Sequence, residues 1–420
     1  MNSIKKLNLE VILISLIPIS AVFSIFFLEL SLVIVMSLFL IDIIKKKDFT
    51  IFNNFFSKIF IFFYLYLITR LFFSDYIIDE FVSIFFYFRY GLYVLAIFYF
   101  LKKYNYLEKY FLIVTIFTLS ILLFDGFFQF FVGKNIIGYP TVDGQRITSF
   151  FNDESILGSY LIKFLPFLYL FMFKNFKNQK VLIYLLTLLT ATSVIIFLSG
   201  ERAAFLLMLL LTLYFIFMIK KLKILRIIFF SISIISMIGI FFLEENIQSR
   251  YLQTVKELKK SENRLNNEIL DRKYTIGNYY IISPTHNNYY ITAYRMFLDN
   301  KIFGHGPKSF KFLCKDDRFR INVWSCSTHP HNYYLQLLAE TGLIGFITIF
   351  VIFLLILARC LKIFFDSKKN FSLIEICLLS FFLVNLWPLT STGNFFNNWI
   401  SILIYIPISF YLFYKDKNDF

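Results

Sequence analysis

The sequence predicts an all-α polytopic membrane protein with about twelve transmembrane helices and one long polar loop. Of its 420 residues, 58% are hydrophobic, only 16% are charged, and 59 are phenylalanine. A soluble domain could not hide that much apolar surface in one core. Apolar runs of about 20 residues, the length that a helix needs to cross the hydrocarbon layer of a bilayer, recur along the chain.

The twelve predicted spans leave one large gap, between the ninth and the tenth. They cover residues 8–26, 27–44, 54–73, 81–101, 108–131, 155–173, 181–198, 203–220, 226–243, 333–358, 372–391 and 396–414. The boundary near Glu29 is poorly marked, so the pattern also fits eleven or thirteen spans. The first run lacks a small-residue cleavage site and is expected to be a span, not a signal peptide. The chain therefore divides into nine spans (1–243), a long loop (244–332) and three spans (333–420).

The net charge of +15 follows the predicted topology. Basic residues cluster in alternate loops, at 5–6, 45–47, 102–103, 174–180, 220–226, 359–369 and 415–417. The short loops between them are poor in lysine or acidic, as in 74–80. This alternation is the positive-inside pattern, and it places both termini in the cytoplasm and the long loop outside. The basic excess is therefore a topology signal and does not indicate a nucleic-acid partner.

Two of the four cysteines, Cys314 and Cys326, lie in the long outer loop. An oxidising compartment favours a disulfide between them, which would contribute about 3 kcal/mol of stability by closing a short loop. The alternative is a metal site that combines the two cysteines with His329 and His331, but this spacing matches no usual zinc pattern.

The long loop contains two predicted helices and a turn. Residues 245–273 have apolar side chains at helical spacing, which predicts an amphipathic helix. A second helix is expected over 287–298. Gly304, Gly306 and Pro307 then favour a turn over continued helix.

One histidine and several arginines on the outer face suit chemistry on a phosphate-bearing substrate. His331 follows a proline and precedes a membrane helix, so its position is well defined and its imidazole suits general-base work on a hydroxyl. Arg202 begins a span; it is either an arginine that snorkels to the interface or one paired with Glu201 or an anionic substrate. Arg146 is a further outward arginine. Arginines bind phosphate oxygens in a bidentate manner.

Three other basic residues have structural alternatives. Arg295 lies just before the glycine turn, where it either binds a substrate phosphate or makes a surface ion pair with Asp299. Arg89 and Lys163 lie inside predicted spans, and pairing with Asp125 or Glu154 is the structural interpretation. The chain has no glycine-rich nucleotide loop and no acidic pair typical of metal-dependent transferases, so neither a cofactor nor a metal is predicted.

Together these motifs resemble the O-antigen ligase and O-antigen polymerase superfamily of bacterial envelope enzymes. The segment from His331 to Gly342 resembles a histidine–ten residues–glycine motif, and residues 303–307 resemble the Gly-x-Gly-Pro turn that precedes it. Residues 199–202 resemble a Ser-Gly-x-Arg turn before a span, and residues 125–151 resemble the family's early outer loop.

The resemblance implies a membrane glycosyltransferase (GT-C-like) fold and glycan transfer from an undecaprenyl-pyrophosphate carrier, independent of metal and with inversion. It implies that Arg202 and Arg295 hold the pyrophosphate and that His331 activates the acceptor hydroxyl. Arg146, Arg89 and Gly342 are possible additions to the site. The ligases often have leucine four positions after the loop arginine, whereas Leu298 follows Arg295 by three.

The function expected from the sequence is that of an O-antigen ligase in the bacterial inner membrane. It would transfer a polysaccharide from undecaprenyl pyrophosphate to a hydroxyl of lipid A–core at the periplasmic face, among membrane lipids and without nucleic acid. The first alternative is an O-antigen polymerase that joins lipid-linked repeat units. The second, from another class, is a transporter of lipid-linked sugars, which would carry charges along its spans and often shows repeated halves.

Overall fold

The computed structural model describes residues 8–73, 77–258, 283–366 and 371–417. In these ranges the chain forms helices and no β-strand, with only two isolated β-bridges, Lys134 with Pro140 and Val142 with Arg146. The fold is therefore all-α, as the sequence predicts.

Each of the twelve predicted spans overlaps a helix or a pair of helices. The first half contains α1 (Leu9–Ser15), α2 (Ile17–Phe23), α3 (Ile25–Lys46), α4 (Phe55–Leu71), α5 (Ile77–Phe85), α6 (Phe88–Lys103), α7 (Leu107–Val132), α8 (Leu157–Asn175), α9 (Gln179–Ser199), α10 (Arg202–Met218) and α11 (Lys223–Leu243). The second half contains α12 (Glu245–Leu258), α13 (Pro284–Asp299), α14 (Phe310–Leu313), α15 (Tyr333–Phe365), α16 (Leu373–Leu386) and α17 (Asn398–Asp416). Within the described ranges, seven helical stretches are long and apolar enough to cross a membrane. The protein is thus a multi-pass membrane protein, and the number twelve stays a prediction.

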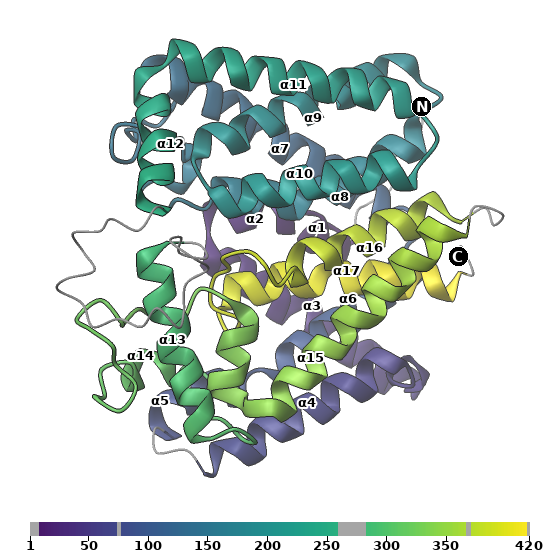
Figure 1. Cartoon of the computed structure of the whole chain (residues 1–420). Helices are drawn as coiled ribbons and strands as arrows, with labels where there is room; N and C mark the ends of the chain where they lie inside the picture. The colour runs from purple at the N-terminus through teal and green to yellow at the C-terminus, as the bar shows by residue number, and fades with distance from the viewer. Residues whose placement is uncertain (1–7, 74–76, 259–282, 367–370, 418–420) are drawn as a thin grey trace.

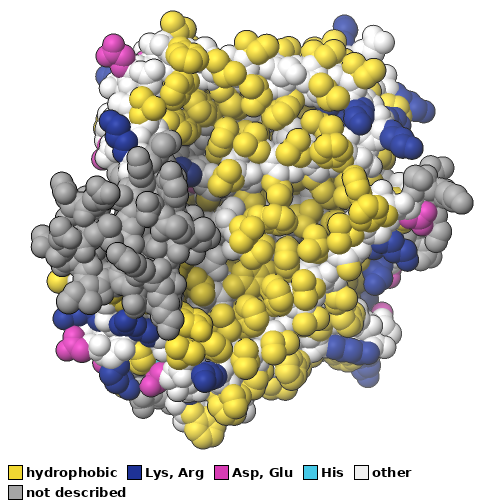
Figure 2. All heavy atoms as spheres, in the orientation of Figure 1, with side chains coloured by type: hydrophobic (Ala, Val, Ile, Leu, Met, Phe, Trp, Pro, Cys, Tyr) yellow, Lys and Arg dark blue, Asp and Glu magenta, His cyan; other side chains and the backbone are white. Residues whose placement is uncertain are grey.

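The helices form two groups that meet along α8 and α16. α7, α8, α9, α10 and α11 pack on one another, and α3, α4, α6, α15, α16 and α17 form the second group (Figure 1). Both ends of the chain lie on one side of the molecule, and α12, α13 and α14 lie on the opposite side. Hydrophobic side chains form a broad belt between these two sides (Figure 2). A belt of this kind is the surface that a bilayer covers.

The boundary between the first two predicted spans needs correction. Ser24 caps α3, because its side chain accepts a hydrogen bond from the Phe27 amide, so α3 begins at Ile25. Glu29 consequently lies inside α3 and pairs with Arg89 at 3.1 Å. The prediction that Arg89 pairs with Asp125 or Glu154 was therefore wrong, and its partner makes Arg89 a structural residue between α3 and α6. Lys163 likewise bonds a different partner, the Asn385 side-chain oxygen, at 2.5 Å.

The predicted span 372–391 is too long at its C-terminal end. α16 ends at Leu386, and Trp387 adopts an extended backbone conformation. Pro388 explains this end, because a proline disfavours the helical conformation of the residue before it. The non-helical segment 387–397 returns across the mouth of the helix bundle before α17 begins.

The long outer loop contains the two helices that the sequence predicts. α12 covers the first half of the predicted helix 245–273, and residues 259–273 lie outside the described residues. α13 confirms the second helix and extends it to Pro284. Ser283 caps α13 by accepting a hydrogen bond from the His286 amide, and α13 packs against α15.

Candidate functional site

A backbone joint between two glycine motifs fixes the geometry of the outer face. Gly342 interrupts α15 with φ 59° and ψ −163°, a conformation that only glycine adopts readily. The turn around Gly304 lies against this break: the Gly306 amide donates to the Glu340 carbonyl at 2.8 Å. A Cβ on Gly342 would lie 2.3 Å from the Ile302 carbonyl oxygen, and a Cβ on Gly304 would lie 2.5 Å from the Gly342 nitrogen. Gly342 is therefore a packing residue.

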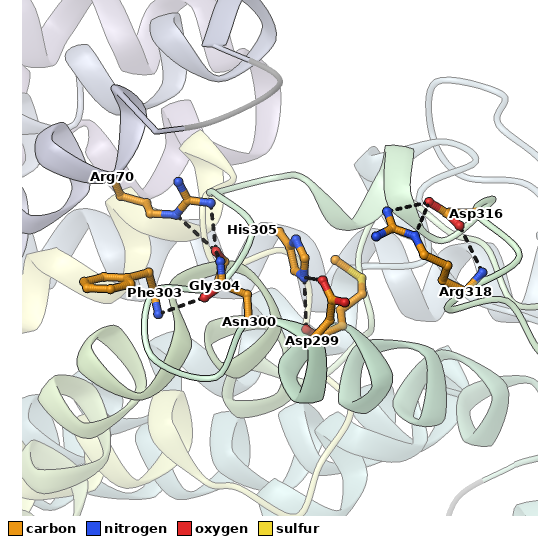
Figure 3. Close-up of polar contacts among 9 residues, drawn as sticks. Arg70, Asp299, Asn300, Phe303, Gly304, His305, Asp316 and Arg318 are labelled. Atoms are coloured by element: carbon orange, nitrogen blue, oxygen red, sulfur yellow. Dashed lines mark hydrogen bonds and ion pairs between the residues drawn. The ribbon is translucent and has the colours of Figure 1, made fainter.

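Buried side chains from α4 secure the same joint. The Gly304 carbonyl accepts hydrogen bonds from Arg70 at 2.8 and 3.1 Å and from Asn300 at 2.8 Å (Figure 3). The Tyr66 hydroxyl donates to the Thr341 carbonyl at 2.5 Å. The Tyr66 bond satisfies a carbonyl that the interruption of α15 leaves without a helical partner, and the bonds from Arg70 and Asn300 satisfy the carbonyl of the turn packed against it.

A polar stripe on the first turns of α15 holds the segment that follows α16. Asn332, Gln336 and Glu340 recur every four residues and therefore share one face of the helix. Asn332 Nδ2 donates to the Pro388 carbonyl at 2.9 Å. Gln336 Nε2 donates to Glu340 Oε2 and to Asn394 Oδ1, both at 2.9 Å. This stripe fastens the segment after α16 to the first turns of α15, which directly follow His331.

Three histidines meet at the N-terminal end of α15. The rings of His329 and His331 have centroids 4.1 Å apart, and those of His286 and His331 have centroids 5.2 Å apart. Tyr289 stacks on His331 at 5.5 Å, and His331 Nε2 lies 3.2 Å from Ser327 Oγ. His331 has φ 57°, a left-handed conformation that is uncommon for a residue with a Cβ. Such strain is typical of functional positions. We call His286, His329 and His331 the histidine cluster.

The histidine cluster is uncharged at neutral pH. Burial lowers the pKa of His331 to about 3, and the neighbouring His329 and His286 add to this effect. Burial also lowers the pKa of His329 to about 4 and shifts the pKa of His286 in the same direction. The neutral form, which can accept a proton, is therefore the resting state of all three imidazoles.

We expect the protein to lose stability below pH 6.5 because of this cluster. Histidines with lowered pKa in the folded state take up protons preferentially on unfolding, so their stabilising effect is full above pH 6.5 and declines as the pH falls toward 4. His329 and His331 each contribute roughly 1 kcal/mol per pH unit in that window. Thermal unfolding between pH 7.5 and 4.5 measures the slope. A His329→Asn variant with the wild-type slope would contradict this expectation.

Three arginines gather beside the turn between α9 and α10. Arg250, on α12, donates to the Gln145 carbonyl at 3.1 Å and to the Phe197 carbonyl at 3.4 Å. Burial lowers the pKa of Arg250, and the positive charges of Arg146 and Arg202 lower it further. Since an arginine stays charged in any case, this site concentrates positive charge. We call Arg146, Arg202 and Arg250 the arginine cluster.

The arginine cluster acts electrostatically on the histidine cluster. Arg202 is exposed at the start of α10, and its charge contributes to the lowered pKa of His286. The two clusters come from four parts of the chain: the loop after α7, the turn before α10, the long loop with its helices, and the start of α15. Guanidinium groups beside a neutral imidazole can bind an anionic group and accept a proton from a hydroxyl near it.

Buried polar residues of α7 shape the loop that carries Arg146. Asp125 accepts hydrogen bonds from the Ile136 amide at 2.9 Å and from the Ser149 hydroxyl at 2.6 Å. Gln129 Oε1 accepts from the Thr148 amide at 2.9 Å. The Asp125 carboxylate and the Gln129 side-chain amide therefore stabilise the conformation of this loop.

Glu201 binds the start of α8. Its carboxylate accepts from the Gly158 and Ser159 amides at 2.5 and 2.9 Å and from the Ser159 hydroxyl at 2.5 Å. A carboxylate is stabilised at a helix N-terminus, where amides lack helical partners. Glu201 thus has its hydrogen-bond partners at the start of α8, besides the expected alternative of a Glu201–Arg202 pair.

The structure does not bring Arg295 or His305 to the histidine cluster. Arg295 donates to the Arg320 carbonyl at 3.0 Å. It follows His286 on α13 by nine residues, or about two and a half turns, which places the two side chains on opposite faces. His305 Nε2 lies 3.0 Å from the Met296 carbonyl and 3.5 Å from Asp299, so it closes the end of α13 (Figure 3). Asp299 therefore pairs with His305, and the expected alternative of an Arg295–Asp299 pair is not seen.

A disulfide joins Cys314 and Cys326, whose Cα atoms are 5.1 Å apart. The cysteines thus bind each other and are not shared with His329 and His331 as metal ligands. Among the described residues, no group of three or more His, Cys, Asp or Glu side chains is arranged to hold a metal ion.

We expect removal of this disulfide to lower stability by about 2–3 kcal/mol, because the closed loop is short. The Cys314→Ser/Cys326→Ser variant should unfold at lower temperature than the wild type under non-reducing conditions. Mass spectrometry of unreduced peptides tests the link directly, and two free thiols in the wild type would disprove it. Reduction should leave the double variant unchanged.

Two residues of the site escaped the sequence analysis. His286 lies near a stretch without a recognisable motif, and only the packing of α13 on α15 carries it to His331. Arg250 is one of many charges on an amphipathic helix. The sequence distinguishes Arg250 only weakly from these charges: it directly precedes Tyr251, and Tyr251 belongs to the apolar face of that helix.

The fold and the two clusters define a multi-pass helical membrane protein with an arginine- and histidine-lined polar site at one end. Residues 185–350 match a family described as O-antigen ligase, a segment that includes Arg202, Arg250, His286 and His331. This match supports the resemblance that the motifs show to the O-antigen ligase superfamily, a family of membrane glycosyltransferase-like ligases. The chain matches no curated protein.

Proposed function

We propose that this protein is an O-antigen ligase that transfers a polysaccharide from undecaprenyl pyrophosphate to a hydroxyl of lipid A–core. The observation that carries the proposal is that an arginine charge acts on a cluster of neutral imidazoles: beyond the effect of burial, the charge of Arg202 lowers the pKa of His286. A pyrophosphate leaving group and an attacking hydroxyl need these two features side by side.

In this proposal the arginine cluster binds the pyrophosphate. Negative charge grows on the bridging phosphate oxygen as the glycosidic bond breaks, and fixed guanidinium groups stabilise that charge without reorganising. Arg202 keeps the role that the resemblance implies. Arg250 takes the place assigned to Arg295, because Arg250 lies beside Arg202 and Arg295 lies on the far face of α13.

His331 accepts the proton of the acceptor hydroxyl. The oxygen then attacks the anomeric carbon from the side opposite the pyrophosphate, so the configuration inverts. One carbon–oxygen bond forms, the bond to the pyrophosphate breaks, and the proton remains on the imidazole. The bound pyrophosphate would raise the pKa of His331 from its low resting value, because a nearby anion favours imidazolium. Donor binding would thus strengthen the base.

The proposed topology places this site in the periplasm and both termini in the cytoplasm, in the bacterial inner membrane. Two features support it. Basic loops alternate along the sequence as the positive-inside rule requires, and the chain ends lie opposite α12, α13 and α14.

The test is a transfer assay with purified protein, EDTA and undecaprenyl-pyrophosphate-linked glycan, with lipid A–core or without an acceptor. Product on lipid A–core supports the ligase. Longer lipid-linked chains without acceptor would instead establish a polymerase. If intact protein gave no product, the ligase and the polymerase proposals would both be overturned and a transporter would be favoured. Flipping of a labelled lipid-linked sugar in proteoliposomes would then test the transporter.

We expect Arg250→Gln to lower kcat/KM for transfer by 10–100-fold, or about 1.4–2.7 kcal/mol, because the substitution removes a charge from the proposed pyrophosphate site. Arg318→Gln is the matched control: Arg318 is exposed and pairs with Asp316 at 2.7 Å, away from both clusters. Arg295→Gln should resemble that control. The opposite ranking, with Arg295→Gln inactive and Arg250→Gln active, would return the role to Arg295.

A further inference from the structure

A large apolar cleft lies at the opposite end of the molecule from the two clusters. Its volume is about 1000 Å³, and its walls come from α4, α6, α15, α16 and α17. Phenylalanine and isoleucine side chains dominate its interior, among them Phe60, Ile352 and Ile408. None of the residues that line it belongs to the arginine or histidine cluster.

The mouth of the cleft is basic. Five cationic side chains and two carboxylates, Asp48 and Asp416, line it. Three of the cations make ion pairs: Lys102 with Asp416 at 2.8 Å, Lys103 with Asp42 at 2.5 Å and Arg359 with Glu375 at 2.6 Å. The cations are Lys46, Lys102, Lys103, Lys415 and Arg359. They stand at the ends of α3, α6 and α17 and late in α15, on the side of the molecule where the chain ends lie.

Along α15 the lining of the cleft runs from Thr348 to Arg359, which at 1.5 Å per residue is about 16 Å. Half of a hydrocarbon core of about 30 Å is about 15 Å, so this wall is long enough to contact an acyl chain across one leaflet. The lining also includes Leu386, the last residue of α16, and Phe395, whose amide donates to the Gln336 side chain at 2.9 Å.

We propose that this cleft binds one phospholipid with an anionic head group from the leaflet on the side of the chain ends. The acyl chains would replace water against the phenylalanine and isoleucine walls. The phosphate would lie among the lysines of the mouth, where juxtamembrane basic residues attract anionic lipids. The basic residues at the mouth and the long apolar wall along α15 together select this occupant. The proposal does not depend on the proposed transferase function.

The experiment compares dioleoyl phosphatidylglycerol with dioleoyl phosphatidylcholine, added to full-length, delipidated protein in detergent. Native mass spectrometry counts bound lipid, and thermal unfolding reports stabilisation. We expect one phosphatidylglycerol retained per protein, with a saturable rise in melting temperature, and at least tenfold weaker binding of phosphatidylcholine. Equal binding of the two lipids would overturn the proposal that the cleft selects an anionic head group. Equal stabilisation by glycerol 3-phosphate alone would overturn the proposal that a whole lipid, with its acyl chains, binds there.

Two variants locate the bound lipid. Ile408→Trp fills the cleft and Lys415→Glu reverses a charge at its mouth; each should lower phosphatidylglycerol retention at least tenfold. Lys417→Glu is the matched control, because Lys417 lies at the same end of α17 but does not line the cleft, and it should bind normally. Unchanged retention in both cleft variants would overturn the proposal. Competition by undecaprenyl phosphate at equal concentration would assign the cleft to an isoprenoid chain and also overturn it.

Discussion

Replacing His331 by alanine is expected to lower the rate of glycan transfer by 10²–10⁴-fold, the usual contribution of a general base. His331 contacts both His286 and His329, and its loss removes the proton acceptor from the proposed reaction. The measurement is transfer to lipid A–core in detergent, with protein whose insertion and melting temperature match the wild type.

His305→Gln is the matched control for this loss. His305 contacts the Met296 carbonyl, and a glutamine amide can keep such a bond without a basic ring. We expect near wild-type transfer from this variant. Full transfer activity in a correctly inserted His331→Ala protein would defeat the catalytic role.

Replacing Gly342 by alanine is expected to destabilise the folded protein by more than about 4 kcal/mol, a size that single substitutions rarely reach. Two costs add. The backbone conformation at Gly342 disfavours any residue with a Cβ by about 1–3 kcal/mol, and the new Cβ would lie 2.3 Å from the Ile302 carbonyl oxygen. The turn around Gly304 would have to move away from α15. Thermal or denaturant unfolding in detergent measures the effect.

Gly239→Ala provides the comparison for Gly342→Ala. Gly239 lies within α11, and a Cβ there meets no atom within 4 Å. Alanine has the higher helix propensity, so this variant should be neutral or more stable by up to about 1 kcal/mol. If Gly342→Ala behaved like Gly239→Ala, the glycine joint would not be the element that holds the outer face together.

The glycine joint changes how two sequence motifs are interpreted. Read along the chain, the turn at Gly304 and the glycine at 342 look like separate features of a substrate loop. In the structure they are two halves of one contact, and each glycine is required because the other backbone lies where its Cβ would be. Gly342 therefore belongs to the support of the site, and His331 at the other end of that motif belongs to the site itself.

The site shows where prediction from single motifs ends. His331 and Arg202 could be proposed from the sequence because each lies at the boundary of a hydrophobic run, where a polar residue stands out. His286 and Arg250 lie in helices of the long loop, where polar residues are common and no pattern separates one from another. Arg295 has the position of a site residue along the sequence, yet the rotation of α13 turns it away from His286.

The sequence by itself determined that this chain is a helical membrane protein, where its apolar segments lie, and that it resembles the O-antigen ligase superfamily. These conclusions depend on composition, run length and local motifs, which are properties of contiguous residues. The tertiary structure alone decided which side chains meet: Arg89 with Glu29, Arg250 with the loop that carries Arg146, and His286 with His331. These contacts join segments up to 105 residues apart, and they depend on how helices pack and rotate, which no local pattern encodes.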